Sequence, residues 1–234
     1  MDVAIVTLFP ELFSAFAKTS FVGRAVDQGT LRLHLEELRK HGLGNHLSVD
    51  DTPYGGGSGM VMRPDCVVSA MESAEMSLGG SARPRRILLT PQGRVFDQAV
   101  ARRLSEQAGL VIVCGRYEGF DERARYFADE ELSIGDFVLT GGEVAAMCVV
   151  EAVVRLLPGV LGNAESVREE SFSPACGGLL EYPQFTRPAN YRGYEVPEVL
   201  RGGNHEKIAA WRRAQAEARS RVRRPDLMRG RRRR

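Results

Sequence analysis

The fold is decided by the stretch Leu110-Val111-Ile112-Val113-Cys114-Gly115-Arg116-Tyr117-Glu118-Gly119, in which an apolar run leads directly into a glycine-marked loop. Two other stretches repeat this form: Ile87-Leu88-Leu89 leads into Thr90-Pro91-Gln92-Gly93, and Leu132 leads into Ser133-Ile134-Gly135-Asp136. Short apolar runs bounded by Gly and Pro are typical of buried parallel strands. The sequence therefore predicts an α/β domain with a parallel sheet.

The three loops, together with Gly141-Gly142-Glu143, are predicted to form one ligand pocket. Ligands of open α/β sheets bind beyond the carboxyl ends of the strands, where such loops meet. The alternative is three ordinary turns between strands and helices. The chain contains neither Gly-x-Gly-x-x-Gly after a strand nor Gly-x-x-x-x-Gly-Lys-Ser/Thr. The absence of both phosphate motifs favours a cofactor that is recognised through its base, sugar and amino-acid parts.

Composition sets the broad class of the protein. The chain has 234 residues, of which 43% are hydrophobic and 26% charged, as in ordinary globular proteins. It has no run of 18 apolar residues and no basic segment before the first apolar stretch, so we expect neither a membrane span nor a secretory signal. Its four cysteines are far apart, which favours free buried thiols in a reducing cytoplasm over a zinc site.

Charge is distributed unevenly along the chain. Residues 201–234 hold 13 Lys and Arg against 3 Asp and Glu, whereas residues 1–200 hold 19 against 27. A basic region attached to an acidic body favours a polyanionic partner, and nucleic acid is the first choice. The alternative is a disordered tail, which is an equally good reading of Arg231–Arg234 taken alone.

Pro10 is expected to start one helix, and Ser20 to cap a second that runs through Val26. Further helices are expected over residues 64–76, 143–157 and 206–219, and further strands over 2–9 and 31–35. Residues 143–157 are apolar on nearly all sides, which predicts deep burial or a subunit interface. In the segment 206–219 we expect one face to carry Ile208, Trp211, Gln215 and Ala218, with Arg212, Arg213 and Arg219 largely off that face and Trp211 as a core anchor. Residues 160–196 show no regular pattern, which is typical of a functional segment or a linker.

Residues 50–60 contain four glycines within five positions, at 55–57 and 59. Such a stretch buries few side chains and provides backbone flexibility or close approach. Asp50, Asp51 and Tyr54 beside the glycines favour a loop that faces substrate over a plain surface linker.

Taken together, the motifs resemble the TrmD family of bacterial tRNA (guanine-N1)-methyltransferases. The stretches that carry the resemblance, in chain order, are Leu8-Phe9-Pro10, Val49 to Gly57, Pro91-Gln92-Gly93-Arg94, Gly115 to Arg123, Ser133 to Asp136, Leu157 to Gly162, Gly203-Asn204-His205 and Arg223-Arg224-Pro225. Each stretch is a weak signal alone, but their joint order and spacing are specific, and they cover nearly the whole chain.

The resemblance implies a parallel sheet flanked by helices and tied into the trefoil knot of the SPOUT class, with a small helical domain at the C-terminus. The implied domains are a methyltransferase domain at 1–160, a linker at 161–172 and a tRNA-binding domain at 173–234. The cofactor implied is S-adenosylmethionine, bound by Pro91, Gly93, Gly115, Tyr117, Ile134, Gly135, Asp136, Phe137, Val138, Leu139, Gly141 and Gly142. Glycines are expected there because a Cβ would block the approach of adenine and ribose to peptide groups.

The resemblance also implies the reaction, which is methyl transfer to N1 of guanosine 37 in tRNA, just 3′ of the anticodon, a modification that prevents reading-frame errors. N1 carries a proton at neutral pH, so a base must remove it and a cation must hold the charge that builds on O6. Arg155 matches the family's arginine, although a cation at a helix C-terminus also stabilises the helix dipole.

The chain departs from the family pattern at the catalytic base. Glu170, within Arg168-Glu169-Glu170-Ser171-Phe172, stands where the family has aspartate. A glutamate carboxylate is one methylene farther from the backbone, and misplacement by about 1 Å can cost about a hundredfold in rate. Three readings stay open: Glu170 is the base with adjusted geometry, Glu169 has taken the role, or the enzyme is slow or inactive.

Further properties follow from the resemblance alone. They are a homodimer with its active site between subunits, tRNA as partner, substrate contacts by Asp50, Asp51, Tyr54 and Ser166, and Mg²⁺ as an aid to methyl transfer, although no carboxylate cluster marks a metal site. A second departure is the C-terminus, where four arginines stand in place of the family's further helices. Two rival functions remain: a knotted methyltransferase with another RNA target, and a non-catalytic RNA-binding protein.

Overall fold

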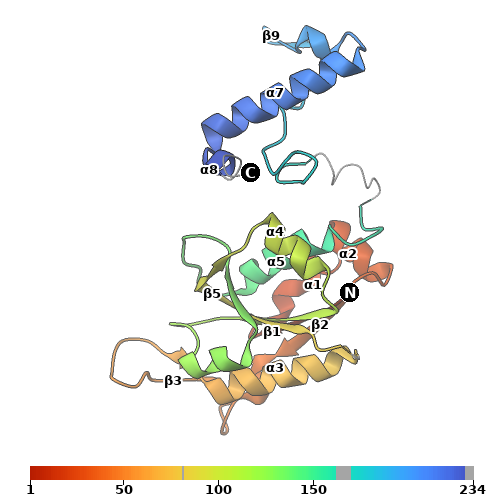
Figure 1. Ribbon diagram of the computed structural model, residues 1–234. Helices are drawn as coiled ribbons and strands as arrows, with labels where there is room; N and C mark the ends of the chain where they lie inside the picture. The colour runs from red at the N-terminus through yellow and green to blue at the C-terminus, as the bar shows by residue number, and fades with distance from the viewer. Residues whose placement is uncertain (81, 162–169, 230–234) are drawn as a thin grey trace. The chain divides into compact units, whose positions relative to one another are not determined.

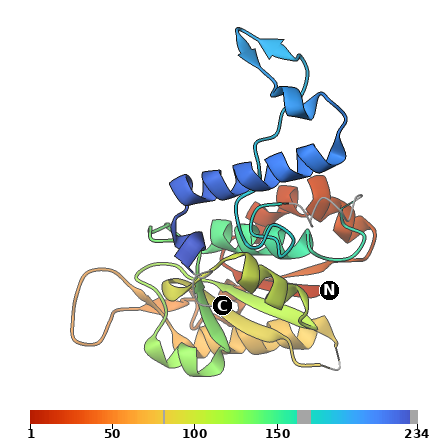
Figure 2. The ribbon, with the colours of Figure 1, turned by 45° about the horizontal axis from the view of Figure 1, so that its top comes forward.

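The computed structural model describes residues 1–80, 82–161 and 170–229. The chain divides into two compact units, Met1–Gly162 and Asn163–Arg234, which are described separately. Figures 1 and 2 show the ribbon of the chain in two views. None of the helices in the described ranges is both long enough and apolar enough to cross a membrane.

The first unit is built on a five-stranded parallel sheet. Its strands are β1 (Asp2–Thr7), β2 (Arg32–Glu37), β5 (Arg85–Val95), β6 (Gly109–Cys114) and β7 (Glu130–Ser133), in the order β2-β1-β6-β5-β7. All four neighbouring pairs are parallel. The α/β class and the parallel strands predicted from the apolar runs are thus confirmed.

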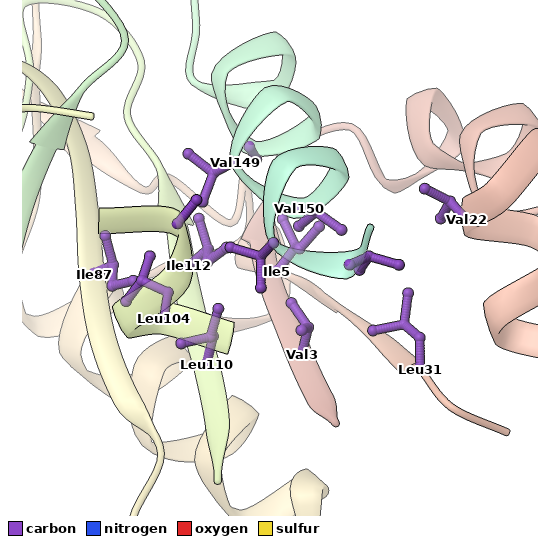
Figure 3. Close-up of a cluster of buried hydrophobic side chains, with 14 of the residues drawn as sticks. Val3, Ile5, Val22, Leu31, Ile87, Leu104, Leu110, Ile112, Val149 and Val150 are labelled. Carbon is purple, nitrogen blue, oxygen red and sulfur yellow. The ribbon is translucent and has the colours of Figure 1, made fainter. Parts of the chain in front are cut away.

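Helices cover both faces of the sheet. Figure 1 shows α3 (Pro64–Leu78) below the sheet, and α2 (Ser20–Asp27), α4 (Gln98–Ser105) and α5 (Glu143–Val154) above it. Alternate residues of β6 face opposite layers: Ile112 belongs to the core cluster with α5, while Val111 and Val113 belong to the cluster with α3. Figure 3 shows the first cluster, in which Val149 and Val150 of α5 lie over Ile5 and Ile112.

Short elements connect these layers. They are η1 (Pro10–Leu12), α1 (Phe13–Phe16), η2 (Leu38–His41), η3 (Glu122–Phe127) and the antiparallel pair β3 (Asp50–Asp51) and β4 (Val61–Met62). The helix expected at Pro10 therefore begins as a 3-10 turn. Ser20, whose side chain was expected to cap α2, is instead its first residue, and Thr19 precedes it without a side-chain cap because its hydroxyl donates to the Ala15 carbonyl at 2.6 Å.

Helix α5 ends three residues earlier than predicted, at Val154, with Arg155 as its C-cap. Its inner side is fully buried at Val149, Val150 and Val153, whereas Val144 is 56% exposed. The expectation of burial is therefore met on one side only, and the outer side keeps an apolar surface. The prediction that the cysteines are buried holds for Cys66 and Cys114 but is wrong for the exposed Cys148 and the half-buried Cys176.

The second unit contains the hairpin β8 (Asn190–Tyr191) and β9 (Tyr194–Glu195), η4 (Glu198–Leu200), α7 (His205–Arg223) and α8 (Asp226–Arg229). The predicted helix at 206–219 is confirmed and is longer at both ends, with the Asn204 side chain accepting from Lys207 N at 3.0 Å. The hairpin interrupts the segment for which the sequence indicated no regular structure. Its turn uses Arg192 and Gly193, both with positive φ.

The packed face of α7 differs from the one expected. Ala216 and Ser220 are buried and Arg212 and Arg219 are half-buried, while Ala218 is exposed. Ala216 and Ser220 are small enough for the segment around Leu180 to lie close to α7, where Ser220 Oγ accepts from Leu180 N at 2.9 Å. Arg212 lies 4.5 Å from the ring centre of Tyr182, which explains how a charged side chain occupies this face. Trp211 packs against Phe185 with ring centres 6.3 Å apart, as expected of an anchor.

Candidate cofactor pocket and active-site residues

A cavity of about 310 Å³ lies where the carboxyl ends of β6 and β7 meet a loop within β5. It is lined by three segments: Leu89–Gln92 after the first part of β5, Gly115–Phe120 after β6, and Leu132–Gly135 at the end of β7 with Phe137–Gly142 beyond it. The loops singled out by their glycines therefore come together in space. Three loops of this kind present many peptide groups to a ligand.

Ten of the twelve residues predicted to bind the cofactor line this cavity. They are Pro91, Gly115, Tyr117, Ile134, Gly135, Phe137, Val138, Leu139, Gly141 and Gly142. Gly93 and Asp136 are not among the lining residues. A Cβ on Gly93 would lie 2.5 Å from the backbone of Glu131 and Leu132, so this glycine allows β5 to approach β7.

The Thr90–Gly93 loop is an outward bulge within β5 and not the end of a strand. Both Leu89 and Arg94 pair with Leu132 of β7, so the residues between them leave the ladder and the chain then returns to it. Bulges of this kind often redirect side chains beside functional sites. Here the bulge carries Pro91 to the cavity.

The glycines before α5 are needed for packing of one loop against another. A Cβ on Gly142 would lie 2.7 Å from Cys114 Cα and 2.8 Å from Gly115 N, both of which are backbone atoms. Gly142 N also donates to Gly115 O at 2.8 Å. Close contact between peptide groups of the protein is therefore a sufficient reason for glycine at this position, in addition to the access for the cofactor expected from sequence.

An ion pair joins Arg116, which lines the cavity and is half-buried, to the buried Glu143. Arg116 Nη2 lies 2.9 Å from Glu143 Oε2, and Glu143 is only 2% exposed. Thr7 Oγ1 donates to the same carboxylate at 3.0 Å, and the Arg116 guanidinium lies 4.4 Å from the Phe9 ring centre. Sequence reasoning singled out the motifs around these residues but gave the residues themselves no role. The sequence feature that could have indicated them is a charged residue next to a glycine in each motif, Arg116 after Gly115 and Glu143 after Gly142.

The Asp50–Met60 segment, which contains β3 and the glycine-rich turn, stands beside the cavity. Burial, followed by the negative charge of the nearby Asp50, raises the pKa of Tyr117. Asp51 pairs with Arg63 at 3.0 Å, and Tyr54 is fully exposed. Asp50 thus lies near a cavity residue, whereas Tyr54 is exposed to solvent. Ser166, the fourth predicted substrate contact, lies outside the described residues.

The two predicted catalytic residues are not among those that line this cavity. Arg155 is the C-cap of α5, whereas the cavity is at the N-terminal end of that helix, at Gly142 and Ala145. Glu170 belongs to the second unit, where its carbonyl accepts from Ser173 N at 3.1 Å. Across residues 1–80, 82–161 and 170–229, no group of three or more His, Cys, Asp and Glu is arranged to hold a metal ion.

The fold and the pocket define a class: an α/β protein whose parallel strands carry three glycine-bearing loops around one backbone-lined cavity. Comparison with known proteins identifies the family within that class. A family described as tRNA (Guanine-1)-methyltransferase TrmD matches residues 1–230. The chain belongs to this family.

Named relatives agree with the family match. A tRNA (guanine-N(1)-)-methyltransferase of Sorangium cellulosum is 56% identical, covering 98% of this chain and 94% of the relative. Proteins of the same name from Moorella thermoacetica and Deinococcus radiodurans are 51% and 50% identical, covering 97% and 98% of this chain and 90% and 81% of the relatives. The resemblance inferred from the motifs is therefore confirmed, and with it membership in a methyltransferase family.

Proposed function

We propose that this protein transfers a methyl group from S-adenosylmethionine to N1 of guanine 37 in tRNA. The observation that carries the proposal is the cavity formed by the loop within β5 and the loops after β6 and β7, found in a chain of the tRNA (guanine-1)-methyltransferase family. The relatives are named for the same activity. The site of action is the cytoplasm, where tRNA is found.

The residues present fit this cofactor. A volume of about 310 Å³ lies at the lower end of the range for small-molecule sites. Leu89, Ile134 and Leu139 provide apolar surface for a flat base, the loop backbones provide donors and acceptors for its edge, and the Glu118 carboxylate at the rim can accept from hydroxyl groups. When bound, S-adenosylmethionine supplies an electrophilic methyl group.

The catalytic work of the chain is divided between a base and a cation. Glu170 takes the proton from N1 of guanine, and N1 then carries the methyl group. Arg155 stabilises the negative charge that builds on O6, for which its planar and permanently charged guanidinium is suited. Ser166 and the Asp50–Met60 segment position the nucleotide.

Two copies of the chain are needed to complete the site. Gly142 and Arg155 stand at opposite ends of α5, about 20 Å apart at 1.5 Å per residue. One arginine side chain does not span that distance, so the cavity of one copy is served by Arg155 of the partner subunit. The outer side of α5, where Val144 is 56% exposed, provides apolar surface for a dimer.

The second unit binds tRNA. Lys207, Arg213, Arg221 and Arg223 are exposed cations on α7, which favour contact with phosphates. At the hairpin, Tyr191 and Tyr194 are 60% and 84% exposed, and Arg192 lies 5.4 Å from the Tyr191 ring centre. Exposed rings beside a guanidinium are suited to stacking on unpaired bases.

The first test is methyl transfer to a tRNA transcript with G36 and G37, comparing the wild type with Glu170→Asp, Glu170→Gln and Glu169→Gln. We expect Glu170→Gln to lose at least about a hundredfold in rate, with activity kept in the other two variants. Loss in Glu169→Gln alone would move the base to Glu169. Activity that appears only in Glu170→Asp would mean that the natural enzyme is inactive, and no activity in any of the four would overturn the guanine-N1 assignment.

The shared active site has its own test. Arg155→Ala and Gly142→Ala are each expected to be inactive as pure dimers. Mixing them under conditions of subunit exchange should restore about a quarter of wild-type activity, because a mixed dimer has one intact site when the residues come from different subunits. No recovery, with exchange verified, would place Arg155 and the cavity of one subunit in the same site. Repeating the wild-type assay with a chelator tests the Mg²⁺ requirement.

A further inference from the structure

A closed loop of residues 170–181, called the base loop below, begins at the proposed catalytic base. Two hydrogen bonds join its two ends. Phe172 N donates to Leu179 O at 2.8 Å, and Glu181 N donates to Ser171 Oγ at 3.1 Å. The two residues that follow the proposed base are therefore held by the far end of the loop.

The far end of the base loop is attached to the last turn of α7. Leu180, which stands between the two residues that close the loop, donates its N–H to Ser220 Oγ at 2.9 Å. Ser220 is fully buried, and Leu179 is only 2% exposed. Figures 1 and 2 show this part of the chain beside α7. Since the hydroxyl is enclosed by protein, water does not readily replace it as the acceptor for Leu180.

A second contact joins the base loop to the end of α7. Arg224, the C-cap of the helix, lies with its guanidinium 5.6 Å from the ring centre of Phe172, and it donates to Asp226 at 2.6 Å. Phe172 has a φ of +66°, a conformation that bulky residues rarely adopt and that persists only where the surrounding contacts impose it. The segment directly after the proposed base is thus held in one conformation from two sides.

We propose that Ser220 is a positioning residue for Glu170, acting through the base loop. The inference rests on the proposed function, in which Glu170 takes the proton from N1 of guanine. Proton transfer requires the carboxylate within hydrogen-bond reach of that nitrogen. A base loop that is released from α7 lets Glu170 move, and misplacement by about 1 Å can cost about a hundredfold in rate. Helix α7 then has two roles, because its exposed cations serve the phosphates of tRNA and its buried hydroxyl serves the base.

The first test is the single-turnover rate of methyl transfer to a G36-G37 tRNA transcript, with cofactor and enzyme saturating. Ser220→Ala removes the hydroxyl that accepts from Leu180 N. We expect the rate to fall roughly 10- to 100-fold. The dissociation constant of the tRNA should change less than about 2-fold, because the base acts on the chemical step. An unchanged rate, or a loss that disappears when enzyme is saturating, would overturn the inference.

The chain offers a matched control one turn earlier on the same packed face of α7. Ala216→Gly weakens the helix but leaves Ser220 and its hydrogen bond in place. We expect the rate of this variant to stay within about 2-fold of the wild type. An equal loss of rate in Ala216→Gly and Ser220→Ala would overturn the inference, because loosening of α7 alone would then explain both.

Two further measurements separate a misplaced base from a damaged fold. In a Glu170→Gln background the base is already gone, so adding Ser220→Ala should slow methyl transfer by less than about 2-fold. The rate of Ser220→Ala alone should approach that of the wild type as the pH rises from about 7 to about 9, because N1 then loses its proton without a base. An equal loss in the two backgrounds would overturn the inference, and so would a loss that is the same at every pH.

Failure of the proposed function gives a different result. Absence of methyl transfer by the wild type, or a Glu170→Gln variant as fast as the wild type, would remove Glu170 as the base. A slow Glu170→Gln variant beside a Ser220→Ala variant as fast as the wild type would overturn only the role of Ser220.

Discussion

The two units of the molecule are built by different means. In the first unit, β6 and residues Val3–Thr7 of β1 are buried, and the cavity is made of loop backbone held by glycines and an ion pair of buried Glu143. In the second unit, the only buried apolar residues in the described range 170–229 are Leu179 and Ala216, and α7 carries a row of exposed cations. The first unit depends on packing, and the second presents charge.

This difference separates two kinds of recognition. A cofactor held by loop backbone in a cavity is recognised by shape, and misplacement by about 1 Å can cost about a hundredfold. A polyanion held by exposed Lys and Arg is recognised by charge, which tolerates displacement but weakens with salt. Substitutions in the first unit should therefore change stability and cofactor affinity without changing salt dependence, and substitutions on α7 should do the reverse.

The largest effect is expected from Glu143→Ala. It leaves Arg116 without its carboxylate and Thr7 Oγ1 without its acceptor at a site where Glu143 is 2% exposed. Loss of one partner of a buried pair costs about 3 kcal/mol or more of unfolding free energy. Urea denaturation measures it. The control is Glu37→Ala, which removes a carboxylate 3.9 Å from Lys40 at the surface and should cost less than about 1 kcal/mol. Equal losses of unfolding free energy in the two variants would show that the Arg116–Glu143 pair does not stabilise the first unit more than a surface pair does.

A smaller effect is expected from Gly142→Ala. The new Cβ would lie 2.7 Å from Cys114 Cα and 2.8 Å from Gly115 N. Both are backbone atoms and cannot turn aside as a side chain can, so the loop at Gly142 must move away from the loop at Gly115. Overpacking of this kind costs about 1–3 kcal/mol. Because the separated loops line the cavity, calorimetry should show at least about a tenfold loss of S-adenosylhomocysteine affinity. Gly202→Ala, whose Cβ would meet nothing closer than 3.8 Å, should leave that affinity unchanged.

The double variant Arg213→Ala, Arg221→Ala tests the second unit. Both side chains are exposed on α7, and removing each cation that binds a phosphate should lower the slope of log affinity against log salt by about 1. Binding of tRNA should weaken severalfold at low salt, while S-adenosylhomocysteine affinity stays the same. The control is Lys18→Ala, Lys40→Ala, which removes two cations of the first unit. An equal change of slope in the control would mean that the charge of α7 has no special role.

How far the sequence determined the structure also differs between the units. Apolar runs such as 110–113 were sufficient to predict the parallel strands, because fully buried strands carry a continuous apolar signal. Glycines marked the cavity loops, and ten of the twelve residues inferred from the resemblance line the cavity. The return of β5 to the ladder at Arg94 was not predictable, since it depends on Leu132 pairing twice.

Other features lacked a local signal. Arg116 and Glu143 are 27 residues apart and pair only because Gly142 packs on Gly115, so sequence spacing does not indicate their contact. The hairpin at 190–195 turns on Arg192-Gly193, which is weaker as a signal than Asn-Gly. Arg155 and Glu170 were found only through the resemblance, because one ends a helix and the other lies in a segment without periodicity. Their roles stay predictions.

The smallest effect is expected at the outer edge of the sheet, where Glu130 of β7 receives hydrogen bonds from Arg103 at 2.6 Å and Arg85 at 2.6 Å. Burial acts to raise the pKa of Glu130, but these bonds and charges outweigh it and hold the pKa below the ordinary 4.5. A lowered pKa stabilises the fold above the ordinary value, and the contribution is lost as the pH falls through the lowered one. Because solvent screens this partly exposed pair, Glu130→Gln should cost less than about 1 kcal/mol at pH 7 and progressively less below pH 4.5. Urea midpoints of both proteins from about pH 7 to about pH 3 measure the difference, and a gap that stays constant over this range would show that packing, and not charge, holds this edge of the first unit.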